Sequence, residues 1–309
     1  MRAHSPNIVS TPADLRIDGA WLWDSLTQLA RIDATDKAGL CGLALTELDR
    51  EARDQFIAWA KEIGCTVRVD AIGDIFAWRA GLRDDLPPVM AGSHIDVQTT
   101  GGRFEGNCGV LAGLEVLRTL AEANVQTIAP LDVAVWTNEE GSRFVPVMMG
   151  SGVYTLERAL AQCDRDGVSV RNARAAIGHA GGHRKPHAVG AYFEAHIEQG
   201  PLLEAHDKVI GVVQGALDHA PHGRGTVGCV EVHLNSHNVI PGCVKCSVDL
   251  RATDDASLTA MDHASRAACK DGISHNEIED ERADHPEAGC NALLQAMVNA
   301  ASKSGSVRS

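Results

Sequence analysis

Apolar and polar positions along the chain follow two periods, one typical of helices and one typical of strands. Residues 46–64 (TELDREARDQFIAWAKEIG) carry apolar side chains at helical spacing and end on a glycine, which predicts an amphipathic helix. Residues 65–81 (CTVRVDAIGDIFAWRAG) alternate and turn once, as a hairpin does. A second helix is predicted over 109–125. Its expected buried stripe consists of Val110, Leu114, Leu117 and Leu120.

Three shorter apolar runs predict strands, at 86–96 (LPPVMAGSHID), 130–141 (PLDVAVWTNEEG) and 189–201 (VGAYFEAHIEQGP). Strands that alternate with helices favour an α/β fold, in which ligands bind at the ends of strands. The third run has a period of two, so its two faces can be assigned. We expect Ala191, Phe193, Ala195 and Ile197 on the packed face, and Tyr192, Glu194, His196 and Glu198 on the polar face.

The pattern of apolar and polar residues changes at about residue 211. Short strand-like runs (VGCVEVHL, KCSVDLRA) lie beside a helical piece (DASLTAMDHASRAA). This predicts a small α+β domain over 211–268, inserted into a catalytic domain formed by 1–210 and 269–309. The tail, EAGCNALLQAMVNAAS, is expected to be helical.

Composition excludes several classes of protein. Among 309 residues, 44% are hydrophobic and 22% charged, as in a globular protein, and the net charge of −13 argues against binding nucleic acid. No apolar stretch resembles a leader or a membrane span, so we expect a cytoplasmic protein that does not bind membranes. The nine cysteines suit reduced thiols. Cys243 and Cys246 lie three apart in a predicted strand and point to opposite faces, which disfavours chelation of one ion.

Polar side chains that can bind a metal recur where predicted strands end. His94 follows one strand, and Asp96 can accept the other imidazole N–H, although taken alone a surface histidine beside an acid is the commoner case. Glu105 precedes a predicted helix, where it is either a capping acid or a ligand. Glu139 and Glu140 are crowded at the end of a strand, and a cation or a shared proton relieves their repulsion.

His196 and His275 complete this set of candidates. His196 is either a hydrogen-bonded strand histidine or a ligand, and His275 lies in an acidic, glycine-containing loop. Nitrogen and oxygen ligands without paired cysteines suit Zn²⁺, Mn²⁺ or Co²⁺. A further group, His179, His183 and His187, is interrupted by Gly and Pro, and we interpret it as a surface loop.

Together these segments resemble one family of dinuclear metal amidohydrolases: N-carbamoyl-L-amino-acid hydrolase, allantoate amidohydrolase and β-ureidopropionase, within the aminoacylase and carboxypeptidase superfamily. The resemblance extends from about residue 21 to about residue 298. It is carried by GSHIDVQTTGGRFEGNCGVLAGLEVL, WTNEEGSRFVPVMMGSGVY, HIEQGPLLE, NVIPG with SVDLR, and DGISHNEIED, in the family's order. The implied fold is a mixed-sheet, metallopeptidase-like catalytic domain with an inserted α+β lid.

The resemblance also implies roles for individual residues. His94, Glu105 and His196 would bind one ion, and Glu105, Glu140 and His275 the other, with Glu139 as general base and Asp96 orienting His94. Asn238 and Arg251 would bind the substrate carboxylate. The implied reaction is attack of a metal-bound hydroxide on the carbamoyl carbon of an N-carbamoyl-L-amino acid or an allantoate-like substrate, with two Zn²⁺, Mn²⁺ or Co²⁺ ions per chain.

This sequence departs from the family pattern in three places. Glu105 stands where the family has a bridging Asp, the lid lacks the HAGTTP-type segment, and the strand before DGISH is missing. The lid is therefore truncated, and the homodimer that the family forms through it is not expected. Two alternative functions stay open: a catalytically impaired metal-binding paralogue, and an aminoacylase or dipeptidase of the same superfamily.

Overall fold

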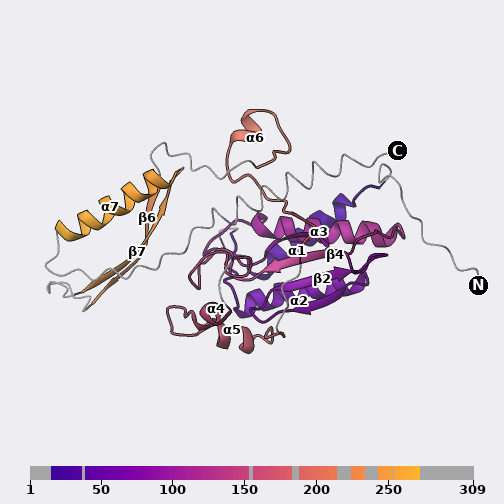
Figure 1. Cartoon of the computed structure of the whole chain (residues 1–309), viewed down its shortest axis with the longest axis horizontal. Helices are drawn as coiled ribbons and strands as arrows, with labels where there is room; N and C mark the ends of the chain where they lie inside the picture. Colours follow the sequence, from indigo (N-terminus) through magenta and orange to yellow (C-terminus); the bar gives the residue numbers. More distant parts are fainter. Residues whose placement is uncertain are drawn as a thin grey trace, which may run out of the picture. The chain divides into compact units, whose positions relative to one another are not determined.

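The computed structural model of the chain describes residues 15–36, 39–152, 156–182, 188–213, 224–233, 243–252 and 254–271. The chain divides into two compact units, with the boundary between Pro201 and Leu202. The first unit contains α1 (Gly19–Ile32), α2 (Glu47–Glu62), β1 (Thr66–Val69), β2 (Ile75–Arg79), β3 (Val89–His94), α3 (Glu105–Glu122), β4 (Leu131–Trp136), α4 (Leu156–Ala161), α5 (Val170–Ala176) and β5 (Ala191–Phe193) (Figure 1). The second contains α6 (Leu202–Ala205), β6 (Arg224–Val232), β7 (Val244–Arg251) and α7 (Asp255–Asp271).

The first unit is built on a mixed five-stranded sheet in the order β1-β2-β4-β3-β5. The strands β1, β2 and β4 pair antiparallel, whereas β3 pairs parallel with both β4 and β5. This confirms the predicted α/β class with a mixed sheet. Because β3 and β4 run in the same direction, with His94 opposite Trp136, both strands end at the same edge of the sheet.

The register of the sheet divides its residues between two packed faces. Ile75 pairs with Val135 and Ala77 with Val133, and these four side chains face the helices α1, α2 and α3. On the opposite face Phe76 and Ala134 pack with Met90 and Tyr192. Each large side chain that is fully buried in this core, such as Phe56, Leu111 and Leu114, stabilises the fold by about 1.5–3 kcal/mol.

Most of the elements predicted for the first unit are confirmed. The predicted helix over 46–64 is α2, capped by the Thr46 hydroxyl and followed by Gly64 at a φ of 84°. The predicted hairpin is the antiparallel pair of β1 and β2. The helix predicted from 109 begins earlier, at Glu105, and Leu120 of its expected stripe is only half-buried.

The predicted strand over 189–201 is wrong in length and in orientation. Only three residues form β5, and Tyr192 is buried, at 8% exposure, while Phe193 is 47% exposed. The tyrosine ring can be buried because its hydroxyl accepts a hydrogen bond from Trp136 Nε1 (2.9 Å) and donates one to Glu194 (3.0 Å). Because its hydroxyl is hydrogen-bonded, Tyr192 can face the core, although the alternation of apolar residues predicts the opposite face.

In the second unit β6 and β7 form a two-stranded antiparallel sheet, and α7 follows β7. Cys243 and Cys246 are exposed free thiols. The proposed limits of an inserted domain at 211 and 268 stay a prediction, and the predicted helix in the tail lies outside the described residues. No helix in the described part of the chain is long and apolar enough to cross a membrane.

Candidate metal centre

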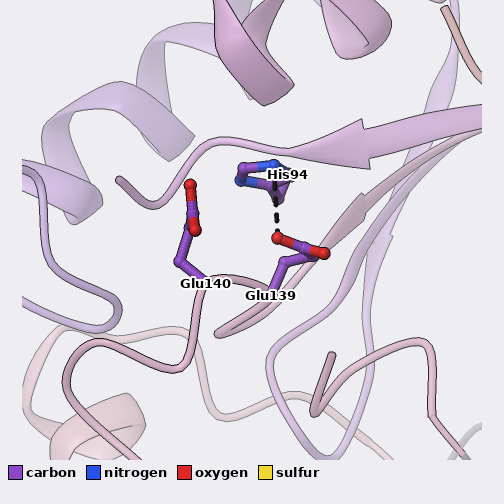
Figure 2. A group of neighbouring side chains, drawn as sticks. All are labelled: His94, Glu139 and Glu140. Atoms are coloured by element: carbon purple, nitrogen blue, oxygen red, sulfur yellow. Dashed lines mark ion pairs between the residues drawn. The ribbon is translucent and has the colours of Figure 1, made fainter. Parts of the chain in front are cut away.

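Three side chains converge where β3 and β4 end. One nitrogen of His94 and one carboxylate oxygen each from Glu139 and Glu140 all lie within 4.8 Å of one another. Figure 2 shows His94 at the end of its strand and the two acids on one loop, with Glu139 in an ion pair with His94 (Nε2 to Oε2, 3.4 Å). Imidazole and carboxylate donors at this spacing suit Zn²⁺, Mn²⁺ or a similar divalent ion.

His94 is fixed from two sides. Its Nδ1 lies 2.8 Å from the backbone carbonyl oxygen of Asp96, which leaves Nε2 directed at Glu139. Its ring lies against Gly106 in the first turn of α3, where an added Cβ would stand 2.4 Å from Nε2. Burial, the largest influence, lowers the pKa of His94, but the charges of Asp96, Glu139 and Glu140 outweigh it and raise the pKa above its usual value. His94 is therefore held in one orientation, and its surroundings favour the protonated imidazole.

The carboxylate of Asp96 binds the loop that carries Glu139 and Glu140, called the acidic loop below, and not the imidazole of His94. Its two carboxylate oxygens accept the backbone N–H groups of Glu139 (3.2 Å) and Glu140 (3.3 Å). The sequence interpretation had the carboxylate accepting the N–H of His94, a contact that the Asp96 carbonyl makes instead. Burial raises the pKa of Asp96 to about 6. Asp96 thus connects the two strand ends that carry the three donors.

The acidic loop is also anchored from beneath, at Thr137. The Asp74 carboxylate accepts the backbone N–H of Thr137 (2.8 Å), and Arg53 Nη2 lies 3.4 Å from its hydroxyl. Arg53 and Asp49 form an ion pair (2.7 Å) in which both side chains are fully buried. Removing one partner of such a pair typically costs about 3–5 kcal/mol, so this cluster ties α2 firmly to the loop.

The two acids of the loop differ in their surroundings. Burial is the main cause that raises the pKa of Glu139 to about 6, and the nearby acids add to it. Glu140 accepts a hydrogen bond from Gln98 Nε2 (2.6 Å) through Oε2, whereas its Oε1 is buried without a hydrogen-bond partner. A buried carboxylate oxygen without a partner, facing an imidazole and another acid, is the arrangement that a cation satisfies. The donor set therefore fits a divalent metal ion.

Glu105 and His196 lie beside this group without being part of it. Glu105 is the first residue of α3 and is 8% exposed, and burial followed by the charge of Glu140 raises its pKa. His196 is exposed, and its ring centroid is 6.3 Å from that of His94. Its Nδ1 lies 2.8 Å from the carbonyl oxygen of Ile197. Glu105 therefore interacts electrostatically with the acids of the loop, and His196 lies beside His94.

The remaining predicted residues lie outside the described residues or in the second unit. His275 and Asn238 lie outside the described residues. Arg251 is exposed on β7, in the second unit, where its Nε donates to Asp249 (2.8 Å). The interpretation of His179, His183 and His187 as a surface loop is wrong for His179. Its side chain is 5% exposed, and its Nε2 lies 3.1 Å from Asp54 Oδ1. His183 and His187 lie outside the described residues.

Sequence reasoning missed three residues that shape the centre. Gln98 binds Glu140, Gly106 admits the ring of His94, and Glu194 accepts a hydrogen bond from Ser93 (2.7 Å), the residue before His94. Only Gly106 carries a signal in the sequence, as a glycine in the first turn of a helix, where close approach of another group is a reason for its presence. The other two are recognised only once the chain is folded.

Comparison with known proteins places this geometry in context. Residues 90–308 match the model of peptidase family M20/M25/M40. An N-carbamoyl-L-amino-acid amidohydrolase of Rhizobium meliloti is 39% identical over 297 residues, covering 80% of this chain and 71% of that protein. A ureidoglycolate hydrolase of Arabidopsis thaliana is 25% identical, covering 96% of this chain and 75% of that protein. The chain spans about half the length of several further curated relatives that it matches.

The fold has a similar counterpart among solved structures. The crystal structure of an amidase of the hydantoinase/carbamoylase family from Burkholderia vietnamiensis superposes with a TM-score of 0.78 at 44% sequence identity. The match covers 84% of this chain and 74% of that one.

Proposed function

Because the chain belongs to peptidase family M20/M25/M40, we propose that it is a metal-dependent amidohydrolase that cleaves the carbamoyl C–N bond of N-carbamoyl-L-amino acids. The observation that carries this proposal is the group formed by His94, Glu139 and Glu140, with the unpartnered buried Oε1 of Glu140. The name of the Rhizobium meliloti relative supplies the reaction class and the substrate class.

In this proposal five residues hold two divalent ions. His94, Glu105 and His196 would hold one ion, and Glu105, Glu140 and His275 would hold the other. The closeness of Glu105 to Glu140 and of His196 to His94 supports the assignment. Bound divalent ions supply Lewis acidity, which polarises a carbonyl oxygen and makes water a nucleophile near neutral pH.

Glu139 serves as general base and then as general acid. Its pKa of about 6 leaves it largely ionised at neutral pH, where it can accept a proton from the attacking water. The same proton passes to the leaving nitrogen as the C–N bond breaks, so the carboxylate is regenerated. The ion pair with His94 keeps Glu139 directed at the centre.

Substrate recognition belongs to the second unit in this proposal. Asn238 and Arg251 bind the substrate carboxylate, and the guanidinium offers a two-pronged match for its oxygens. Residues 211–268 then act as a shortened lid on a catalytic domain formed by 1–210 and 269–309. A ureido acid is the second candidate substrate, because the Arabidopsis thaliana relative aligns with 96% of this chain.

The proposal is tested by elemental analysis of mildly purified protein together with assays of ammonia release. We expect bound Zn²⁺, Mn²⁺ or Co²⁺, and release of ammonia from N-carbamoyl-L-amino acids above that from allantoate or ureidoglycolate. N-acetyl amino acids and dipeptides are the controls for an aminoacylase or dipeptidase. Metal binding without hydrolysis of any of these compounds would favour the impaired paralogue instead.

A further inference from the structure

The segments that carry His94 and His196 are connected beyond the point where the backbones of β3 and β5 stop pairing. The register between β3 and β5 ends at Ala91 opposite Phe193. Two residues further along β3, the Ser93 hydroxyl donates a hydrogen bond to Glu194 Oε1 (2.7 Å). Ser93 immediately precedes His94, and Glu194 lies two residues before His196. A side-chain hydrogen bond therefore connects the two segments beyond the point where their backbones stop pairing.

The second oxygen of the same carboxylate is also used. Tyr192 donates its hydroxyl proton to Glu194 Oε2 (3.0 Å), and Trp136 Nε1 donates to the Tyr192 oxygen (2.9 Å). Ser93 is fully buried and Tyr192 is buried, so both donors stand in fixed positions. Hydrogen bonds to an ionised carboxylate are stronger than neutral ones. Glu194 therefore ties together β3, β4 and β5 at the edge where the candidate centre lies.

Helix α3 encloses the same segment from the other side. A Cβ added at Gly109 would stand 2.5 Å from the carbonyl oxygen of Ala195 and 2.8 Å from Cβ of Ser93. One turn earlier, Gly106 lies against the ring of His94. The backbone between Glu194 and His196 is thus in close contact with the helix, while Glu194 restrains the same segment from the sheet.

We propose that Glu194 is a positioning residue of the candidate metal centre, whose carboxylate, held by Ser93 and Tyr192, sets the placement of His196 relative to His94. The inference rests on the proposed function, because it takes both histidines as ligands. His196 is exposed, and its Nδ1 bonds to the carbonyl oxygen of the next residue, Ile197, so its position depends on the segment that precedes it. Residues that orient a ligand typically change metal affinity by about 10–100-fold when they are replaced.

A negative charge near a cation site also raises affinity, whether or not it positions a ligand. Glu194 is close enough to the acidic loop to act on Glu139 electrostatically, so Glu194→Gln alone does not separate the two effects. Tyr192→Phe and Ser93→Ala do separate them, because each removes one hydrogen bond and leaves the carboxylate charged. Positioning predicts weaker metal binding in these variants, whereas a pure charge effect predicts none.

The experiment measures the affinity of the metal-free full-length chain for Zn²⁺ and for Mn²⁺, in competition with a coloured chelator. We expect affinity to fall about tenfold in Tyr192→Phe and in Glu194→Gln, and severalfold in Ser93→Ala. The double variant Ser93→Ala/Glu194→Gln should bind no more weakly than Glu194→Gln, because both changes break the same link. Glu62→Gln, at an exposed glutamate of α2, is the matched control and should bind as the parent does.

Thermal unfolding of each metal-free variant serves to check that the fold is retained. If the parent chain itself binds no metal, the proposed metal-dependent function fails and this inference fails with it. If the parent binds metal and Tyr192→Phe and Ser93→Ala bind equally well, Glu194 does not position a ligand and only the present inference is overturned.

Discussion

The two histidines that approach each other at the candidate metal centre are held in different ways. His94 is 3% exposed, bonded to the Asp96 carbonyl and packed on Gly106, and it ends a strand paired on both sides. His196 is exposed, lies beyond a strand of three residues, and bonds through Nδ1 to the next residue's carbonyl. One half of the proposed centre is therefore built into the sheet, and the other half depends on a short segment outside it.

This difference indicates how the site is assembled. The half at the ends of β3 and β4 is preorganised, because buried hydrogen bonds and an ion pair under Thr137 fix its acids before any ion arrives. The half that follows β5 presents an exposed His196 side chain, so binding of an ion contributes to ordering it. Variants in the first half should therefore have larger effects than variants in the second.

The largest effect is expected for the adjacent acids. Glu139→Gln should lower hydrolysis about 10²–10⁴-fold while the metal content stays at the parent level, because the general base is lost and the ligands remain. Glu140→Ala should lose metal. Kinetics and elemental analysis of both variants check this. The opposite pattern, with metal lost in Glu139→Gln and retained in Glu140→Ala, would show that the two roles are reversed.

The next largest effect is expected for Gly106, which lies against the ring of His94. Gly106→Ala would place a methyl group 2.4 Å from His94 Nε2, so the ring has to move and its alignment with Glu139 and Glu140 is lost. We expect metal affinity to fall about 10–100-fold. Gly19→Ala is the matched control, because nothing lies within 4 Å of an added Cβ there. Unchanged affinity in Gly106→Ala would mean that His94 is not a ligand.

Stability of the metal-free protein should depend on pH in a defined direction. Burial raises the pKa of Asp96 from 3.8 and of Glu139 from 4.5, each to about 6. Folding then favours the protonated acids, so their contribution is full below about pH 4 and is lost as pH rises to about 6.

We expect the free energy of unfolding to fall over that interval by an amount on the order of 1–3 kcal/mol. The raised pKa of His94 has the same sign and extends the fall to higher pH. Urea unfolding with a chelator present, at several pH values, measures this change. Asp96→Asn should show a smaller fall, and a parent protein that gains stability across the interval would contradict the expectation.

The smallest effect is expected for Glu105→Asp. If Glu105 bridges two ions, its longer side chain holds the carboxylate about 1.5 Å further from the helix than the family's Asp would. We expect severalfold higher activity in Glu105→Asp with little change in stability, and loss of the second ion in Glu105→Gln. A large loss of activity in Glu105→Asp would mean that the site has adapted to glutamate.

Much of the fold could be predicted because local patterns and tertiary packing agree in it. The helix α2 and the β1–β2 hairpin follow the periods of their own sequences, and the family and mixed-sheet class are confirmed. Helix α1 was not predicted, although Asp18 caps it and its apolar residues recur at helical spacing. The faces of β5 were reversed because burial of Tyr192 depends on Trp136 and Glu194, and Trp136 is 56 residues away.

The candidate site shows the same division. Acids and a histidine at the ends of predicted strands were visible in sequence, since parallel neighbours bring their ends together. The side chains that orient them were not visible: Gln98 reaches Glu140 across 42 residues and Ser93 reaches Glu194 across 101. Such contacts depend on the packing of the whole sheet and leave no local pattern.

The central claim is that the edge formed by β3 and β4 is a preformed metal site, and anomalous diffraction from crystals grown with Mn²⁺ or Zn²⁺ tests it most directly. The account predicts an anomalous peak at coordination distance from His94 Nε2 or Glu140 Oε1, with His94 and the acidic loop placed as they are in the present structure. Full occupancy of metal elsewhere in the chain, with no peak beside His94, Glu139 or Glu140, would contradict it.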